Sequence, residues 1–218
     1  MILETFLIFL SLLLAIILHE VAHGYVAYLL GDTTAKIQGR LSLNPLKHID
    51  MVGTIILPLF LWLSRVPFMF GWAKPVPINP QNLKKFPRDE ILVASAGIIM
   101  NLGLALLASL VLHLSSLIID SDFRVVLRLF LFYFMTINIG LAVFNAIPIP
   151  PLDGSKVLFG WIDRPWAKSY LYSYKYGLII MIVLLLILPM IGNNLGLDLN
   201  IIGHYIASAT QYICSFLI

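Results

Sequence analysis

Three residues that can act on a metal ion lie within one helical turn near the start of the chain. His19, Glu20 and His23 form the pattern His-Glu-x-x-His. Residues four apart share a helix face, so the two imidazoles can bind one zinc ion while the Glu20 carboxylate stays beside it as a general base. The pattern is short and can occur by chance, and the three side chains would then only be hydrogen-bonded inside a helix bundle.

The surroundings of this motif favour the catalytic interpretation. Residues 5–30 are predominantly apolar and exceed the roughly 20 residues that a membrane-spanning helix needs. Polar and ionisable groups at membrane depth are costly and each needs a partner, so their presence there indicates a function. We therefore expect a hydrolytic zinc site inside a membrane helix.

A third ligand has to come from elsewhere, because a catalytic zinc usually has three protein ligands and an open fourth position. Asp153 is the strongest candidate. Pro148, Pro150 and Pro151 hold the chain before it extended, and Gly154 permits a turn directly after it. A carboxylate in so rigid a segment is aimed at a target, whereas the alternative is a solvated aspartate in a loop.

The composition places the whole chain among membrane proteins. Of its 218 residues, 60% are hydrophobic and 11% are charged, against roughly 25% charged residues in a soluble domain. We expect an all-α polytopic membrane protein, a helical bundle that forms one domain over residues 1–218. Five apolar segments are candidate spans: residues 5–30, 91–118, 125–147, 177–190 and 199–217.

The chain between the first two core helices differs from the rest. Residues 51–64 are apolar but short, and Gly53 and Pro58 interrupt them. Residues 71–80 contain three prolines and should be extended. We expect a re-entrant segment at 51–64, followed by an extended, membrane-associated segment that lies against the bundle.

Two independent arguments require residues 51–64 to re-enter. His23 and Asp153 must reach the same membrane face to share a metal ion, which leaves an even number of crossings between them. Re-entry also puts twelve of the 14 lysines and arginines on one side and leaves only Arg124 and Arg128 on the other. The positive-inside rule then places the N-terminus outside and the active site toward the cytoplasmic side of a cell inner or plasma membrane.

The net charge of +3 would also suit a protein that binds nucleic acid. Here the basic residues lie in loops between apolar segments, so we expect the anionic face of a lipid bilayer as their partner and no nucleic acid. Residues 155–176 mix lysines and arginines with tryptophans and tyrosines, which is typical of a membrane interface. The single cysteine, Cys214, excludes an internal disulfide.

Taken together, these motifs resemble those of the site-2 proteases, a family of intramembrane zinc metalloproteases. The resemblance rests on His-Glu-x-x-His at 19–23, on Gly97-Ile-Ile-Met-Asn101, and on a spaced pattern of Asn145, Pro148, Pro151, Asp153 and Gly154. It extends from the first helix to about residue 160. Segments 39–50 and 71–77 resemble a compact bacterial and archaeal branch, so we expect neither a PDZ nor a CBS domain.

The residues and the resemblance imply the same chemistry. One zinc ion per chain, bound by His19, His23 and Asp153, would activate water by lowering its pKa to about 7. Glu20 would take the proton from the water and pass it to the leaving amine. The substrates would be transmembrane protein segments that are locally unwound, and extended residues near 37–43 and 72–78 could pair with them by strand addition.

Four further residues are weaker candidates for the site. Asn101 and Asn145 are either donors to the oxyanion or the substrate backbone, or ordinary interhelical hydrogen-bonding residues. His48 and Asp50 could approach from the re-entrant loop, but a polar turn explains them equally well. Asn138, within its span, is interpreted as a helix-packing residue.

Two other classes of function compete with proteolysis. A non-proteolytic membrane zinc-binding protein or transporter would need further intramembrane acids or histidines along a path, and the sequence contains only the one cluster. A catalytically silent scaffold would be expected to lack Glu20 or a ligand. The sequence makes no prediction of the substrate or of the oligomeric state.

Overall fold

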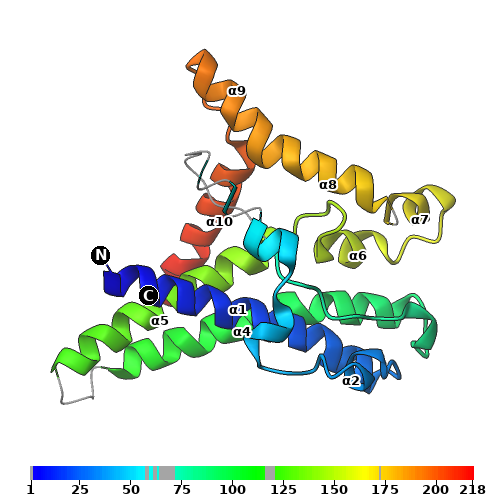
Figure 1. The fold of residues 1–218 in the computed structure, drawn as a ribbon, viewed down its shortest axis with the longest axis horizontal. Helices are drawn as coiled ribbons and strands as arrows, with labels where there is room; N and C mark the ends of the chain where they lie inside the picture. The colour runs from blue at the N-terminus through cyan, green and yellow to red at the C-terminus, as the bar shows by residue number, and fades with distance from the viewer. Residues whose placement is uncertain (1, 57–58, 61–62, 64–71, 116–120, 172) are drawn as a thin grey trace.

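The computed structural model describes residues 2–218 except 57–58, 61–62, 64–71, 116–120 and 172, and every regular element in the described part is a helix (Figure 1). Three long helices form the body of the molecule: α1 (Ile2–Leu29), α4 (Arg88–Leu114) and α5 (Ser121–Asn145). Each of them packs against the other two. The prediction of an all-α helical bundle is confirmed.

The predicted spans correspond to helices whose bounds differ by a few residues. Among the described residues, four helices are long and apolar enough to cross a membrane: Ile2–Leu29, Arg88–Leu114, Asp122–Asn145 and Lys175–Leu195. The fourth is a continuous run of α8 (Tyr174–Ile182), η5 (Val183–Ile187) and α9 (Leu188–Leu195), and it exceeds the predicted 177–190 at both ends. The prediction at 199–217 corresponds to α10 (Ile201–Leu217), which has 17 residues. Residues 116–118 of the predicted second core span lie outside the described residues.

The largest buried cluster joins α4, α5 and α10. Met135 and Ile139 on α5 are 0% exposed and pack against small alanines of α4 and against Cys214 of α10. The hydrophobic effect does not drive helices together inside a bilayer. Packing of this kind therefore depends on small residues that let the backbones approach closely. Ala105 and Ala108 supply such positions on α4.

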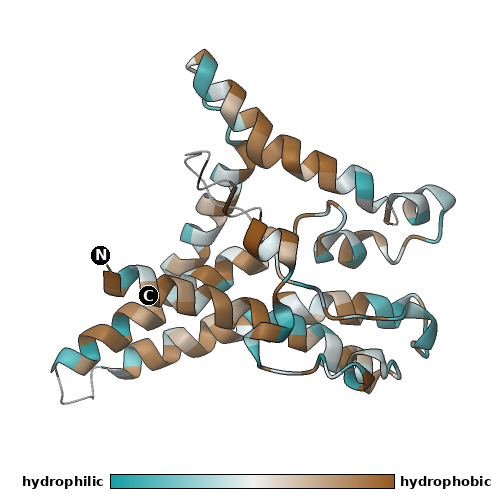
Figure 2. Cartoon of the chain, viewed as in Figure 1, coloured by the Kyte–Doolittle hydropathy of each residue, from teal (hydrophilic) through white to brown (hydrophobic). Residues whose placement is uncertain are grey.

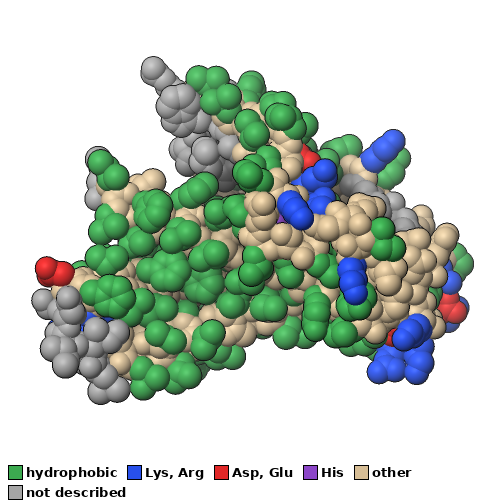
Figure 3. All heavy atoms as spheres, turned by 60° about the horizontal axis from the view of Figure 1, so that its bottom comes forward, with side chains coloured by type: hydrophobic (Ala, Val, Ile, Leu, Met, Phe, Trp, Pro, Cys, Tyr) green, Lys and Arg blue, Asp and Glu red, His purple; other side chains and the backbone are tan. Residues whose placement is uncertain are grey.

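The outside of the bundle is apolar along the helix bodies (Figure 2). The apolar window of α1 is only 28% buried, and that of Lys175–Leu195 only 11%. In Figure 3 hydrophobic side chains cover one half of the visible face, and the Lys and Arg side chains gather over the other half. This distribution agrees with a membrane-embedded body that carries most of its basic residues at one end.

The segment between α1 and α4 forms short helices and an extended stretch. It contains α2 (Thr34–Ile37), η1 (Pro45–His48), η2 (Met51–Ile56) and η3 (Pro80–Asn82). The Trp72 N–H donates to the Gly53 carbonyl at 3.1 Å, and Thr54 Oγ1 donates to the Trp72 carbonyl at 2.8 Å. These bonds hold Gly53 and Thr54 beside Trp72, and the re-entry of residues 51–64 stays a prediction. Residues 57–58, 61–62 and 64 of the predicted re-entrant segment lie outside the described residues.

Residues 72–79, called the strap below, contain no helix, as their prolines predict. The Lys74 N–H donates to the His48 carbonyl at 2.8 Å. The Arg40 guanidinium donates to the carbonyls of Lys74 and Pro75 at 2.9 and 3.2 Å. The strap is thus fixed to the loops that follow α1, and it runs beside that helix.

Candidate metal centre

His19 and His23 lie one turn apart on α1, and both are 7% exposed. The facing helix, α4, presents Gly97 to them. A Cβ at this position would lie 2.4 Å from His19 Cε1 and from His23 Nε2. Only glycine leaves room for both rings, which gives a physical reason for the glycine of the Gly97-x-x-x-Asn101 element.

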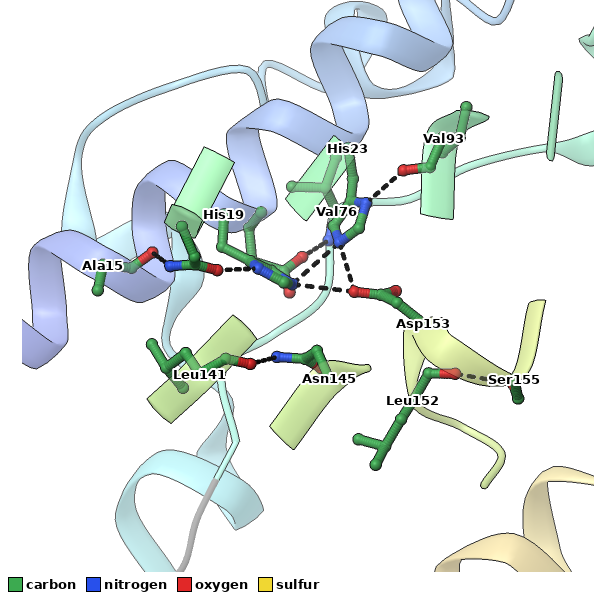
Figure 4. A network of polar contacts seen from close by, with 12 residues as sticks. Ala15, His19, His23, Val76, Val93, Leu141, Asn145, Leu152, Asp153 and Ser155 are labelled. Atoms are coloured by element: carbon green, nitrogen blue, oxygen red, sulfur yellow. Dashed lines mark hydrogen bonds and ion pairs between the residues drawn. The ribbon is translucent and has the colours of Figure 1, made fainter. Parts of the chain in front are cut away.

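Asp153 reaches the same place from the end of α5. The proline-containing residues 146–152 follow α5, and Asp153 opens the short helix α6 (Asp153–Phe159). Its Oδ2 atom lies 3.2 Å from the Nε2 atoms of both histidines, which are 3.0 Å apart (Figure 4). Among the described residues, this trio is the one group of three or more His, Cys, Asp or Glu side chains that could hold a metal ion.

Gly154 acts differently from the sequence prediction, which assigned it a turn. The residue lies within α6, and a Cβ there would lie 2.2 Å from the Ala146 carbonyl oxygen. The glycine therefore lets α6 pack directly against the end of α5. This close packing brings Asp153 back toward α1.

The hydrogen bonds behind the two imidazoles determine what they present to the centre. His23 Nδ1 lies 2.7 Å from the Val93 carbonyl, which can only accept, so Nδ1 carries the proton. His19 Nδ1 lies 2.5 Å from Asn101 Oδ1 and is likewise the donor. Each Nε2 atom therefore presents a lone pair to the centre.

These lone pairs face a buried carboxylate oxygen, Asp153 Oδ2, that has no hydrogen-bond partner. Three acceptors within 3.2 Å of one another repel each other unless a cation lies between them. Two neutral imidazoles and one carboxylate are also the ligand types that catalytic zinc sites use. The residues present therefore fit a zinc ion.

Glu20 lies beside this trio and is held by the strap. Its Oε2 accepts the Val76 N–H at 2.8 Å, and its side chain lines the same cleft as the three ligands. The cleft has a volume of about 650 Å³. Its walls come from α1, the strap, α4, the end of α5, α6 and α8, and include Ile16, Trp72, Pro75, Ala94, Leu141, Asn145, Leu178 and Met181.

The two predicted asparagines take different positions. Asn101 is 0% exposed, accepts from His19 and donates from Nδ2 to Asn138 Oδ1 at 2.8 Å. Its amide is directed at the back of the histidine and away from the cleft, so an oxyanion role does not fit this arrangement. Asn145 lines the cleft, and its Nδ2 donates to the Leu141 carbonyl at 3.0 Å. The amide has a second N–H, so Asn145 remains a candidate donor to substrate.

His48 and Asp50 hold loops and do not line the cleft. His48 is 3% exposed and lies 2.8 Å from the Ser42 carbonyl through Nε2. Asp50 Oδ1 accepts the N–H groups of Val52 and Gly53 at 3.0 and 2.7 Å, which caps the start of η2. The alternative explanation, a polar turn, fits both residues better than a place near the metal.

The predicted pairing of substrate with 37–43 and 72–78 meets two obstacles. Residues 37–39 belong to the end of α2 and the turn after it, so they are not extended. The N–H groups of Trp72, Lys74 and Val76 are already bonded within the protein. The residues between and after these, at positions 75 and 77, are prolines and have no N–H. The strap therefore offers few hydrogen-bond donors to a substrate strand.

Sequence reasoning missed an ion pair in the cleft wall. Lys156 Nζ lies 3.2 Å from Glu90 Oε1, which joins α6 to the first turn of α4. Both residues line the cleft. The available signal was the position of Lys156, three residues after Asp153, which puts both side chains on one face of α6.

Comparisons with known proteins point to a single family. The sequence profile of peptidase family M50 matches residues 118–188. The candidate zinc metalloprotease YwhC of Bacillus subtilis is 36% identical over 176 residues, which cover 79% of this chain and 77% of YwhC. No solved structure matches the chain significantly.

Two mycobacterial relatives are more distant. The candidate zinc metalloprotease Rip2 of Mycolicibacterium smegmatis is 28% identical over 175 residues, which cover 80% of this chain and 64% of that protein. Rip2 of Mycobacterium tuberculosis H37Rv is 25% identical over 210 residues, which cover 94% of this chain and 78% of that protein. The similarity to Rip2 of M. tuberculosis thus extends over nearly the whole chain.

Proposed function

Because the chain belongs to peptidase family M50, the site-2 proteases, and is a zinc metalloprotease, we propose that it hydrolyses peptide bonds in or near the transmembrane segments of other membrane proteins. The observation that carries this proposal is the position of the ligands. His19 and His23 lie within the membrane-spanning helix α1, and His23 is roughly 9 Å from its end at Leu29. A scissile bond has to reach them at that depth, as in regulated intramembrane proteolysis.

His19, His23 and Asp153 would hold the metal through Nε2, Nε2 and Oδ2. Zinc at this place would supply a Lewis acid that polarises the scissile carbonyl and lowers the pKa of a bound water to about 7. The two histidines bind as neutral imidazoles, because their Nδ1–H groups are donated to Asn101 and Val93.

Glu20 is the proposed general base. Its Oε2 is occupied by the Val76 N–H, so Oε1 is the oxygen that can take a proton from the attacking water. The same oxygen can return that proton to the leaving amine nitrogen. The bond from the strap also fixes the direction of the carboxylate, which lowers the cost of orienting it during the reaction.

The oxyanion that forms at the scissile carbonyl needs a further donor. Asn145 lines the cleft at the end of α5, and only one of its amide hydrogens is needed for the bond to Leu141. We therefore propose Asn145, and not Asn101, as the side chain that donates to the oxyanion or to the substrate backbone.

The cleft has an apolar wall at membrane depth through which a substrate helix can approach. Ile16 lies on α1, and Leu178 and Met181 lie on α8. A membrane helix satisfies its own backbone hydrogen bonds, so it must unwind locally before Glu20 and the metal can reach a peptide bond.

The test is cleavage of a model transmembrane substrate by detergent-purified protein, with zinc content measured in parallel. Glu20→Gln should lose cleavage by a factor of about 100 or more while it keeps its zinc, because the base is lost and the ligands remain. Glu4→Gln, at the other end of the same helix, is the matched control and should cleave like the wild type.

Each other outcome of this test has a definite meaning. Equal cleavage by wild type and Glu20→Gln would contradict the assignment of Glu20. A protein that binds zinc but cleaves no transmembrane substrate in a panel of different helices would instead favour the non-proteolytic zinc-binding alternative.

A further inference from the structure

A line of hydrogen bonds runs from the backbone of α5 to the back of His19. Asn138 Nδ2 donates to the Phe134 carbonyl at 2.8 Å, and Asn101 Nδ2 donates to Asn138 Oδ1 at the same distance. Asn101 Oδ1 then accepts from His19 Nδ1 at 2.5 Å. Both asparagines are 0% exposed, so no solvent competes for these bonds.

The direction of this line is fixed at its far end. The Phe134 carbonyl can only accept, so Asn138 must turn its NH₂ group toward it and its oxygen toward Asn101. Asn101 must then turn its NH₂ group toward Asn138, and its oxygen toward His19; the Ala15 carbonyl accepts a second, longer bond from the same Nδ2 atom at 3.5 Å (Figure 4). His19 consequently carries its proton on Nδ1 and keeps the Nε2 lone pair for the metal.

The second histidine shows why such a line is needed. His23 is held by the Val93 backbone carbonyl, which has only one polarity and cannot present a donor. His19 is held by a side-chain amide, and an amide can present either its oxygen or its NH₂ group. A reversed Asn101 amide would donate to Nδ1 and force the proton onto Nε2, where it would occupy the metal position.

We propose that Asn138, whose amide bonds to Asn101 and Phe134 and does not line the cleft, is a positioning residue that fixes the His19 tautomer through Asn101. The proposal rests on the zinc site described above and adds a residue on α5 to it. If Asn138 only packed helices together, its substitution would change the stability of the fold. It would not change zinc affinity in a way that requires Asn101 to be present.

A double-mutant cycle on zinc affinity separates the two roles. The affinities of wild type, Asn138→Ala, Asn101→Ala and the double variant are measured in detergent by competition with a chromophoric zinc chelator. Asn138→Ala should weaken zinc binding by about tenfold, the lower end of the roughly 10–100-fold loss found when outer partners of metal ligands are removed. In the Asn101→Ala background the same substitution should change the affinity less than about twofold, because the connection is already broken.

The control is Ser109→Ala on α4. Ser109 is also buried, and it donates to a backbone carbonyl, that of Leu217, with no connection to the metal centre. Its loss should leave zinc affinity unchanged. Helix content and melting temperature in excess chelator are measured for every variant, and Asn138→Ser replaces Asn138→Ala in the cycle if the alanine variant does not fold.

Two results would overturn the proposal: an Asn138 variant that binds zinc like the wild type, or equal losses in the presence and absence of Asn101. Failure of the underlying zinc site would look different. In that case the zinc affinity of the wild type would be no higher than that of a His23→Ala variant, and the Asn138 variants would not differ from either.

Discussion

At the scale of single residues, the metal centre is defined as much by what lies behind the ligands as by the ligands. The spacing of His19 and His23 and the rigid approach to Asp153 predicted the trio from sequence, because helix periodicity and proline geometry act locally. The roles of Val93 and Val76 were not accessible in this way, and for Asn101 the sequence left hydrogen bonding between helices as one of two alternatives. They depend on contacts between α1 and segments more than fifty positions away.

Gly97 gives a prediction at this scale. Gly97→Ala would place a Cβ within 2.4 Å of both imidazoles, so one ring must move, and zinc affinity should fall at least about tenfold. Gly103→Ala on the same helix is the matched control, since nothing lies within 4 Å of its added Cβ. Zinc content after dialysis against a weak chelator measures the difference, and equal retention by both variants would show that the rings are not confined by α4.

Removal of the metal provides a second prediction. In the apoprotein the three facing acceptors repel each other. Zinc that binds only the folded protein, at about 1,000 times its dissociation constant, should stabilise the fold by about 4 kcal/mol. For a chain of this size each kcal/mol corresponds to roughly 2–4 °C in melting temperature. A strong chelator should therefore lower the melting temperature of the wild type and leave that of His23→Ala unchanged. An identical shift in both proteins would argue against these ligands.

At the scale of elements, the strap is the part that links the fold to the general base. The sequence predicted an extended segment from its prolines, and it predicted three long spans that begin three or four residues after the observed helices. It could not show that the Val76 N–H bonds Glu20 or that Arg40 holds two strap carbonyls. Such contacts leave no periodic pattern in the sequence.

Asp32 ties the end of the strap to the end of α1 and makes the strap sensitive to pH. Its carboxylate is 0% exposed and accepts from the Thr34 backbone and hydroxyl, from the Asn79 N–H and from Asn82 Nδ2. Burial raises the pKa of Asp32, but these donors together outweigh it and hold the pKa below its ordinary value. The resulting stabilisation is present above about pH 4 and is lost as the pH falls through the lowered pKa.

Asp32→Asn should therefore lower the free energy of unfolding by about 2 kcal/mol at neutral pH, because an amide turns a donor toward these donors. The difference from the wild type should shrink below about pH 4. Cleavage should fall while zinc remains, since the strap would no longer aim Glu20. Melting temperature as a function of pH measures the first effect. Asp163→Asn, at an exposed acid paired with Lys168, is the control and should show neither effect.

At the scale of the whole molecule, the charge distribution predicts the membrane orientation. Residues 84–88 carry Lys84, Lys85 and Arg88 beside the start of α4, while Asp122 lies at the start of α5, at the other end of the bundle. The prediction that the N-terminus is outside places Lys84 in the cytoplasm and Asp122 outside.

Cysteine labelling in intact cells tests this orientation. In a Cys214→Ser background, a membrane-impermeant maleimide should label Asp122→Cys but should label Lys84→Cys only after the cells are opened. The reverse pattern would invert the assigned topology and place the catalytic cleft on the outer side. Labelling of both in intact cells would mean that the bundle does not separate the two ends.

The position of Asp153 so far from His19 along the chain has a mechanical consequence. A metal ion held by both would act as a clasp, closing a loop that contains α4, α5 and every segment between α1 and α6. Loop closure of this kind removes conformational freedom from the whole enclosed chain and not only from the ligands. A nick between Lys85 and Arg88 would then yield two fragments whose hold on each other tightens with zinc and loosens with a chelator. The metal that takes part in catalysis would then also stabilise the fold.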